Sequence, residues 1–208
     1  MDSTKINILY DHYKETYKII VSQNTLRDKL FVYLLIALTF MFLQINAVDK
    51  INDIGLKLAE KFLGVSLSLS TEFTSAMFWF ITLSLVIKYA KTLVYIEKQY
   101  DYIHELESRI DKEISNDKLF SREGFSYLNN YPKFSNWVWA LYTVVFPVTL
   151  LGLLSFKICT EYKLGFDTPL LINSIFYIMI VVSVVLYMIK IHFSDNSNDS
   201  EDTADIII

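Results

Sequence analysis

The chain has 208 residues, of which 53% are hydrophobic, and it carries a formal net charge of −4. With a mean hydropathy of +0.34, this composition indicates a multi-pass membrane protein with polar appendages. The single cysteine, Cys159, excludes an intrachain disulfide and a cysteine-based metal site. Polar, tyrosine-rich residues precede the first apolar run, so we expect no secretory signal peptide at the start of the chain.

Four long uncharged runs predict membrane-spanning helices, at 30–48, 73–87, 134–156 and 168–189. A helix needs about 20 apolar residues to cross a hydrocarbon core of about 30 Å. Only backbone that satisfies its own hydrogen bonds can lie there, so helices are expected. The second span reaches residue 95 if Lys88 and Lys91 extend their charged ends to the headgroups. The predicted fold class is therefore all-α, a polytopic membrane protein with four transmembrane helices.

Residues 1–29 are predicted to form a cytoplasmic amphipathic helix. Its apolar positions recur at helical spacing and are rich in tyrosine: Ile6, Leu9, Tyr10, Tyr13, Tyr17, Ile20 and Val21. This stripe has two interpretations. It could face the membrane headgroups, where Tyr is common, or pack against a second cytoplasmic helix, which is the favoured interpretation.

The first span, 30–48, is followed by an expected outer loop, 49–72, that contains a helix of its own. Apolar residues such as Ile51 and Ile54 form one face of that helix, and Gly64 is a plausible C-cap. Such a helix can lie in the membrane interface. A simple connection between two spans is the favoured interpretation.

The second span, 73–95, is predicted to continue without a break into the cytoplasmic region 96–133, because no Gly or Pro occurs from residue 73 to residue 123. A helix of about 40 residues would extend about 60 Å and project from the membrane. Its apolar stripe includes Tyr100, Ile103 and Ile110, which we select as candidate regulatory or assembly residues. The stripe needs a partner, which is either the N-terminal helix or the same helix of another subunit.

The remaining segments are the third span, 134–156, an outer loop, 157–167, the fourth span, 168–189, and an acidic tail, 190–208, expected to be disordered. Pro147 favours a kink inside the third span. Most of the 19 Lys and Arg residues fall in the first 29 residues, the middle loop and the tail. The positive-inside rule therefore places both termini and the middle loop in the cytoplasm.

The search for chemistry yields no catalytic, cofactor-binding or metal-binding residues, so the expectation is a protein that is not an enzyme and needs no cofactor. The four apolar runs contain no ionisable side chain, which argues against an ion-coupled carrier. Gln44 and Asn173, near the outer ends of their spans, are the candidate polar residues. Asn173 is expected to hydrogen-bond between helices, or else to line a narrow wet path. Balanced charges in the middle loop predict no direct nucleic-acid binding.

The segment 100–132, with the motifs YIHELE, SREG and YLNNYP, resembles small four-span bacterial inner-membrane proteins encoded near phage-defence genes. In architecture the chain is also similar to the transmembrane effectors of retron and CRISPR-accessory systems. The resemblance implies assembly in the inner membrane and breaching of that membrane after a cytoplasmic trigger. It carries no catalytic signature.

The leading functional hypothesis is a non-enzymatic bacterial inner-membrane effector that permeabilises or depolarises the membrane in anti-phage defence. Its expected partners are the lipid bilayer, further copies of the chain, and a cytoplasmic protein or ribonucleoprotein. The alternative is a membrane scaffold or regulatory subunit that tethers a cytoplasmic partner and conducts nothing.

Overall fold

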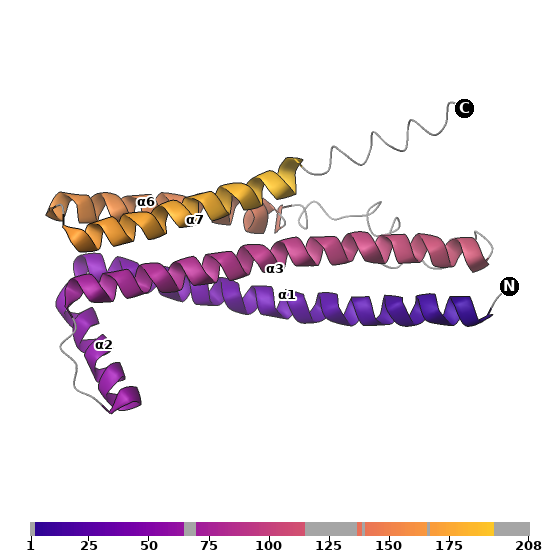
Figure 1. Cartoon of the computed structure of the whole chain (residues 1–208), viewed down its shortest axis with the longest axis horizontal. Coiled ribbons are helices and arrows are strands. Elements are labelled where there is room, and N and C mark those ends of the chain that lie inside the picture. The colour runs from indigo at the N-terminus through magenta and orange to yellow at the C-terminus, as the bar shows by residue number, and fades with distance from the viewer. Residues whose placement is uncertain (1–2, 65–69, 115–136, 139, 166, 194–208) are drawn as a thin grey trace. The chain divides into compact units, whose positions relative to one another are not determined.

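The computed structural model describes residues 3–64, 70–114, 137–138, 140–165 and 167–193. Within these ranges the chain is helical and contains no strand, as the predicted all-α class requires. Figure 1 shows the elements in order: α1 (Ser3–Asn46), α2 (Val48–Leu63), α3 (Thr71–Ile114), the π-helix η1 (Leu141–Val145), α6 (Phe146–Leu164) and α7 (Thr168–Phe193). The predicted return segment 115–133, and with it the SREG and YLNNYP motifs, lies outside the described residues.

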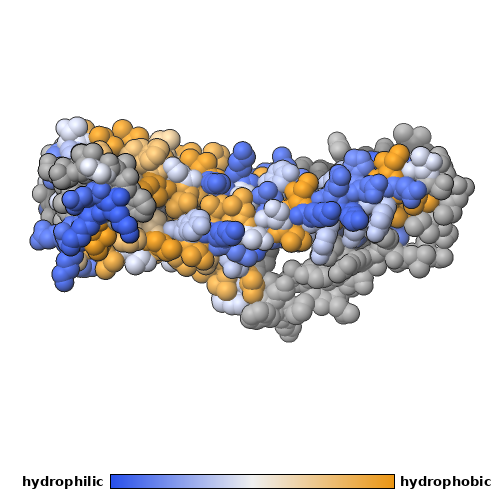
Figure 2. Space-filling view, turned by 90° about the horizontal axis from the view of Figure 1, so that it is seen from below, coloured by the Kyte–Doolittle hydropathy of each residue, from blue (hydrophilic) through white to orange (hydrophobic). Residues whose placement is uncertain are grey.

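Among the residues that the structure describes, four helical stretches are long and apolar enough to cross a membrane: Thr4–Asn46, Thr71–Glu113, Leu141–Lys163 and Thr168–Ile191. Each contains one of the four predicted spans or most of it. The protein therefore has the helices of a multi-pass membrane protein. Figure 2 shows hydrophobic side chains covering much of the bundle surface on the side viewed.

Helices α1 and α3 have 44 residues each and are far longer than a membrane crossing. Neither contains an internal Gly or Pro, so nothing in the sequence interrupts the backbone hydrogen-bond ladder. The unbroken second helix predicted from this absence is confirmed as far as Ile114. The N-terminal helix and the first span, predicted as separate segments 1–29 and 30–48, are one continuous helix as far as Asn46.

The chain forms two compact units. The first, the helix-pair unit, comprises residues 1–29 and 91–142. The second, the bundle unit, comprises residues 30–90 and 143–208. Helices α1 and α3 contribute to both units, whereas α2, α6 and α7 belong to the bundle unit.

The core of the helix-pair unit is formed where α1 and α3 pack together. Five residues are buried there: Tyr13, Ile20, Ile103, Leu106 and Ile110. Leu9, Tyr17 and Tyr100 pack against them. The favoured interpretation of the tyrosine-rich stripe, packing against the second helix, is thus confirmed for Tyr13 and Ile20. Tyr10 and Val21 of the same stripe are about half exposed, at 48% and 49%.

Helix α2 ends where the sequence places its C-cap. Gly64 adopts a left-handed conformation, with φ of 67°, and its N–H donates to the carbonyl of Glu60. On the exposed face, Lys57 Nζ lies 2.7 Å from Asp53 Oδ2, one turn away. The hydrogen bond to Asp53 and the attraction of its charge raise the pKa of Lys57 above the ordinary value.

The irregularity expected at Pro147 takes the form of a π-helix. Pro147 lies in the first turn of α6, directly after η1. Proline has no N–H to donate to the preceding turn, and the wider π-helical turn accommodates this gap. Two predicted boundaries also differ. The segment 157–167, expected to be an outer loop, is helical as far as Leu164, and the fourth helix continues into the predicted tail as far as Phe193.

Candidate functional site

Polar side chains from four helices meet inside the bundle unit, close to one end of each helix. We call this group the polar cluster. It comprises Gln44 of α1, Ser75 and Trp79 of α3, Lys157 and Glu161 of α6, and Asn173 of α7. Each residue lies within three turns of a helix end. The apolar runs keep the helices together, and the polar residues near their ends are thereby brought to one level.

An ion pair forms the centre of the polar cluster. Lys157 Nζ lies 3.0 Å from Glu161 Oε1, and the two side chains are only 5% and 13% exposed. Residues four apart lie on the same face of a helix, so α6 itself aligns the pair. Isolated charges at this depth would be strongly unfavourable, and their mutual attraction offsets part of that desolvation cost.

The Glu161 carboxylate accepts hydrogen bonds from three helices. Ser75 Oγ donates to it at 2.8 Å and Asn173 Nδ2 at 2.9 Å, in addition to Lys157. Trp79 Nε1 lies 3.3 Å from Oε2 and 3.4 Å from Oε1. Both carboxylate oxygens of Glu161 therefore have hydrogen-bond donors. Glu161 thus joins α3, α6 and α7 through its carboxylate.

Gln44 and Asn173 stand at the two ends of this chain of hydrogen bonds. Lys157 Nζ donates to Gln44 Oε1 at 3.4 Å, and Asn173 Nδ2 also lies 3.3 Å from Ser75 Oγ. Both amides are buried, at 2% and 3% exposure. Among the residues that the structure describes, Gln44 Nε2 and Asn173 Oδ1 nevertheless have no hydrogen-bond partner. Each buried amide thus has one satisfied end and one unsatisfied end.

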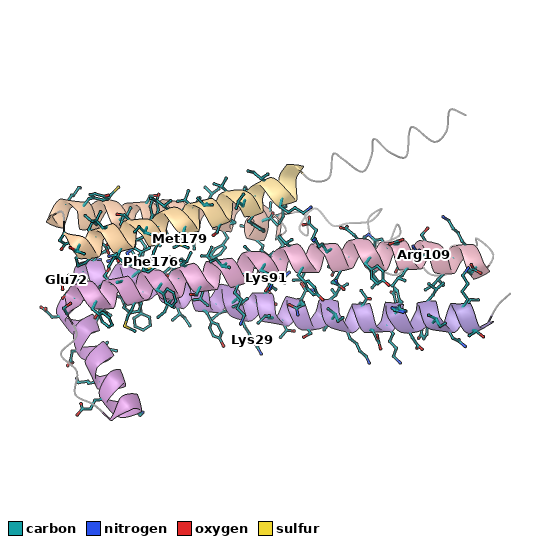
Figure 3. The ribbon with its side chains drawn as sticks, in the orientation of Figure 1. Lys29, Glu72, Lys91, Arg109, Phe176 and Met179 are labelled. Carbon is teal, nitrogen blue, oxygen red and sulfur yellow. The ribbon has the colours of Figure 1, made fainter. Side chains whose placement is uncertain are left out.

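A cavity of about 380 Å³ adjoins the polar cluster. It is lined by Gln44, Ser75, Lys157, Glu161 and Asn173, and further out by residues that include Glu72, Asp167 and Leu170. Glu72 stands at the N-terminal end of α3 (Figure 3). Asp167 caps α7, because its Oδ1 accepts the backbone N–H of Leu170 at 3.0 Å. The lining therefore carries three carboxylates and one ammonium group.

The polar cluster consists of two amides, a hydroxyl, an indole N–H and one ion pair. The polar cluster holds no His or Cys, and its only carboxylate is saturated with donors. Within the described ranges, no three His, Cys, Asp or Glu side chains gather as a metal site. The exposed part of the cavity lining carries the carboxylates of Glu72 and Asp167.

The two predicted polar residues, Gln44 and Asn173, belong to the same cluster. The favoured interpretation of Asn173, hydrogen bonding between helices, is confirmed by its contact with Ser75 of α3. Sequence reasoning missed the ion pair, because the third span was ended at the first charge and Lys157 was assigned to a loop. The helical stretch Leu141–Lys163 continues past the predicted end of this span and includes both residues of the ion pair. A lysine and a glutamate four residues apart at the end of an apolar run were the available signal.

The predicted regulatory stripe lies in the helix-pair unit. Ile103 and Ile110 are fully buried against α1 of the same chain, and Tyr100 is partly buried beside them. The structure thus supplies one of the two partners that the sequence left open, the N-terminal helix. Tyr13 Oη donates to the buried Glu107 at 3.3 Å within this core. A role of the stripe in regulation or assembly stays a prediction.

The comparison with known proteins identifies no relative. None of the protein-family models, curated proteins or solved structures compared with this chain matches it.

Proposed function

We propose that this chain is a non-enzymatic bacterial inner-membrane effector that permeabilises or depolarises the membrane. The observation that carries this proposal is the polar cluster inside the bundle unit. Ionisable side chains within membrane-spanning helices are costly, and where they occur they commonly line paths for ions or solutes. A bundle that served only as an anchor would be more stable with an apolar interior.

In this proposal the bundle of one subunit is the closed state. Further along each helix, the side chains that follow the cluster are apolar and buried, such as Met41, Leu83, Leu154 and Ile180. Such a core leaves no wet path. Opening therefore requires rearrangement of the helices, and assembly of several copies is the simplest way to provide a new path between them.

The proposed topology places both termini and the helix-pair unit in the cytoplasm and the polar cluster toward the outer side. It rests on the distribution of Lys and Arg along the chain. The helix-pair unit would dock a cytoplasmic protein or ribonucleoprotein that triggers opening, while Ile103 and Ile110 in its core hold α1 and α3 together. The assignment to anti-phage defence rests on the resemblance of the segment 100–132 to proteins encoded beside such genes.

A membrane-potential measurement tests the proposal. Overproduction in bacteria is expected to collapse the signal of a potential-sensitive dye and to slow growth. Asn173→Leu removes a polar group from the cluster and should weaken the effect. Ile175→Leu, at a position of the same helix that is 56% exposed, is the matched control and should not. A membrane that stays polarised while the protein is shown to be inserted would favour the scaffold.

The scaffold is the second candidate because the helix-pair unit also exposes apolar side chains. Ile8, Tyr10, Ile19, Val21 and Tyr102 are between 38% and 54% exposed there. Apolar side chains on a charged cytoplasmic helix pair suit a docked protein. The dye experiment separates the candidates, since a tether that conducts nothing leaves the potential intact.

A further inference from the structure

We infer that three exposed lysines of the helix-pair unit bind the phosphate groups of anionic phospholipids. We call these residues, Lys29 of α1 and Lys91 and Lys98 of α3, the lysine collar. The inference goes beyond the proposed function. It requires only that α1 and α3 cross a membrane, so it applies to an effector and to a scaffold alike.

Lys29 and Lys91 lie at the same level of the helix pair, although they belong to different helices. Tyr13 of α1 donates to Glu107 of α3 at 3.3 Å, and this contact defines where the two helices meet. Lys29 lies 16 positions after Tyr13, and Lys91 lies 16 positions before Glu107. Because α1 and α3 run in opposite directions (Figure 1), both lysines lie about 24 Å from that contact, toward the same end of the pair.

On both helices an exposed apolar surface ends where the lysine collar begins. Val32 and Ile36 of α1 are about half exposed, and so are Phe80 and Ile87 of α3. Exposed apolar side chains on a membrane-spanning helix contact the acyl chains of lipids. A lipid whose acyl chains contact these residues would therefore place its headgroup beside the lysine collar.

The length of α3 agrees with this placement. Glu72 and Lys91, both labelled in Figure 3, are 19 positions apart. This spacing corresponds to about 28 Å along the helix axis, close to the hydrocarbon thickness of about 30 Å. From residue 73 to residue 96 the chain contains no acidic residue, so the first basic groups beyond the apolar stretch have no acid of the same stretch beside them. Lys98 lies two turns beyond Lys91, and its flexible stem can reach back toward the headgroups.

The chemistry of the lysine collar suits a phosphate. Within the described ranges, none of its three ammonium groups has an ion-pair or hydrogen-bond partner. An ammonium group only donates hydrogen bonds, and phosphate oxygens only accept them. Tyr95, which is 40% exposed, lies between Lys91 and Lys98 on one face of α3 and is a residue typical of the headgroup level. Lipids with a net negative charge are expected to be preferred, because the ammonium group of a zwitterionic headgroup repels the lysines.

The lipid selectivity of the full chain tests the inference. The chain is placed in nanodiscs of phosphatidylcholine with a trace of spin-labelled phosphatidylglycerol or of spin-labelled phosphatidylcholine. The fraction of label whose motion the protein restricts gives the relative association of the two lipids. Phosphatidylglycerol should be preferred by roughly fivefold at low salt. The preference should approach one near 1 M NaCl, where the Debye length is only about 3 Å.

Variants assign the preference to the lysine collar. Lys29→Gln/Lys91→Gln should lower it by about threefold at low salt. The matched control, Lys14→Gln/Lys112→Gln, removes the same charge from exposed positions of the same two helices. Lys14 and Lys112 lie 15 and 21 positions farther from the apolar stretches. These spacings are at least about 22 Å, more than two Debye lengths, so the control should keep the preference of the parent.

A comparison of salts separates the lipid headgroup from free phosphate. At equal ionic strength, sodium phosphate should lower the preference no more than NaCl does. A several-fold greater loss in phosphate would assign the lysine collar to the free ion and overturn the assignment to lipid. The inference also fails if the parent shows no preference for phosphatidylglycerol, if Lys29→Gln/Lys91→Gln retains it, or if the control variant loses it equally. The dye experiment on the proposed function is decided independently of these outcomes.

Discussion

The bundle unit and the helix-pair unit share α1 and α3, yet their ion pairs differ in burial. The bundle buries the ion pair Lys157–Glu161 and surrounds it with polar side chains from all four long helices. The core of the helix-pair unit contains one carboxylate, Glu107, which accepts a hydrogen bond from Tyr13. Its ion pairs Lys5–Glu113, Arg27–Asp28 and Glu105–Arg109 lie toward the surface. We expect from this comparison that the burial of an ion pair decides how strongly its loss changes the stability of the unit.

The largest loss of stability is expected when one member of the buried ion pair in the bundle unit is removed. Glu161→Leu leaves the Lys157 ammonium buried beside apolar helices, and removing one member of a buried pair costs about 3–5 kcal/mol. The double variant Lys157→Met/Glu161→Leu removes both charges and should regain most of that loss. Denaturant unfolding of the purified protein in detergent, followed by circular dichroism, measures both. A Glu161→Leu variant as stable as the parent would show that water reaches the pair freely.

An intermediate effect is expected from the core of the helix-pair unit. Ile103→Ala removes most of a fully buried side chain and should cost about 2–4 kcal/mol of the stability of this unit. Tyr102→Ala, at the neighbouring and exposed position, is the control and should cost less than about 0.5 kcal/mol.

Hydrogen exchange of the α1 and α3 amides reports this effect directly. Ile103→Ala should raise exchange in residues 9–20 and 100–110 and leave exchange around Trp79 unchanged, because the two positions belong to different units. Equal acceleration in both regions would contradict the division of the chain into units that lose structure separately.

The fold was largely predictable because its signals are local. Uncharged runs of sufficient length predict spanning helices, and the absence of Gly and Pro from α3 predicts its continuity. Gly64 ends α2 as expected, since only a residue without a side chain adopts positive φ at low cost. The same absence of breaks in α1 would have predicted one helix from residue 3 to residue 46, but the change from polar to apolar composition suggested a boundary there.

The candidate site was predictable only in part, because it depends on contacts between distant residues. Gln44 and Asn173 stand out as polar residues in apolar runs. Lys157 and Glu161 do not, because a charge at the end of a run ends a span by hydropathy alone. Their burial arises from partners far away in the sequence, such as Ser75 and Trp79, and no periodic pattern encodes those contacts.

The smallest change in stability is expected from the exposed ion pair at the surface of the helix-pair unit. Lys5 and Glu113 join the two helices, but their side chains are 58% and 29% exposed. Solvent screens such a pair, and ordering two long side chains opposes the attraction. A double-mutant cycle with Lys5→Ala and Glu113→Ala should therefore give a coupling energy below about 1 kcal/mol, which falls as salt rises. A coupling above about 2 kcal/mol that salt leaves unchanged would mean that this pair behaves like Lys157–Glu161. In that case exposure would not set the strength of an ion pair in this protein, and the two units would differ only in which residues they contain.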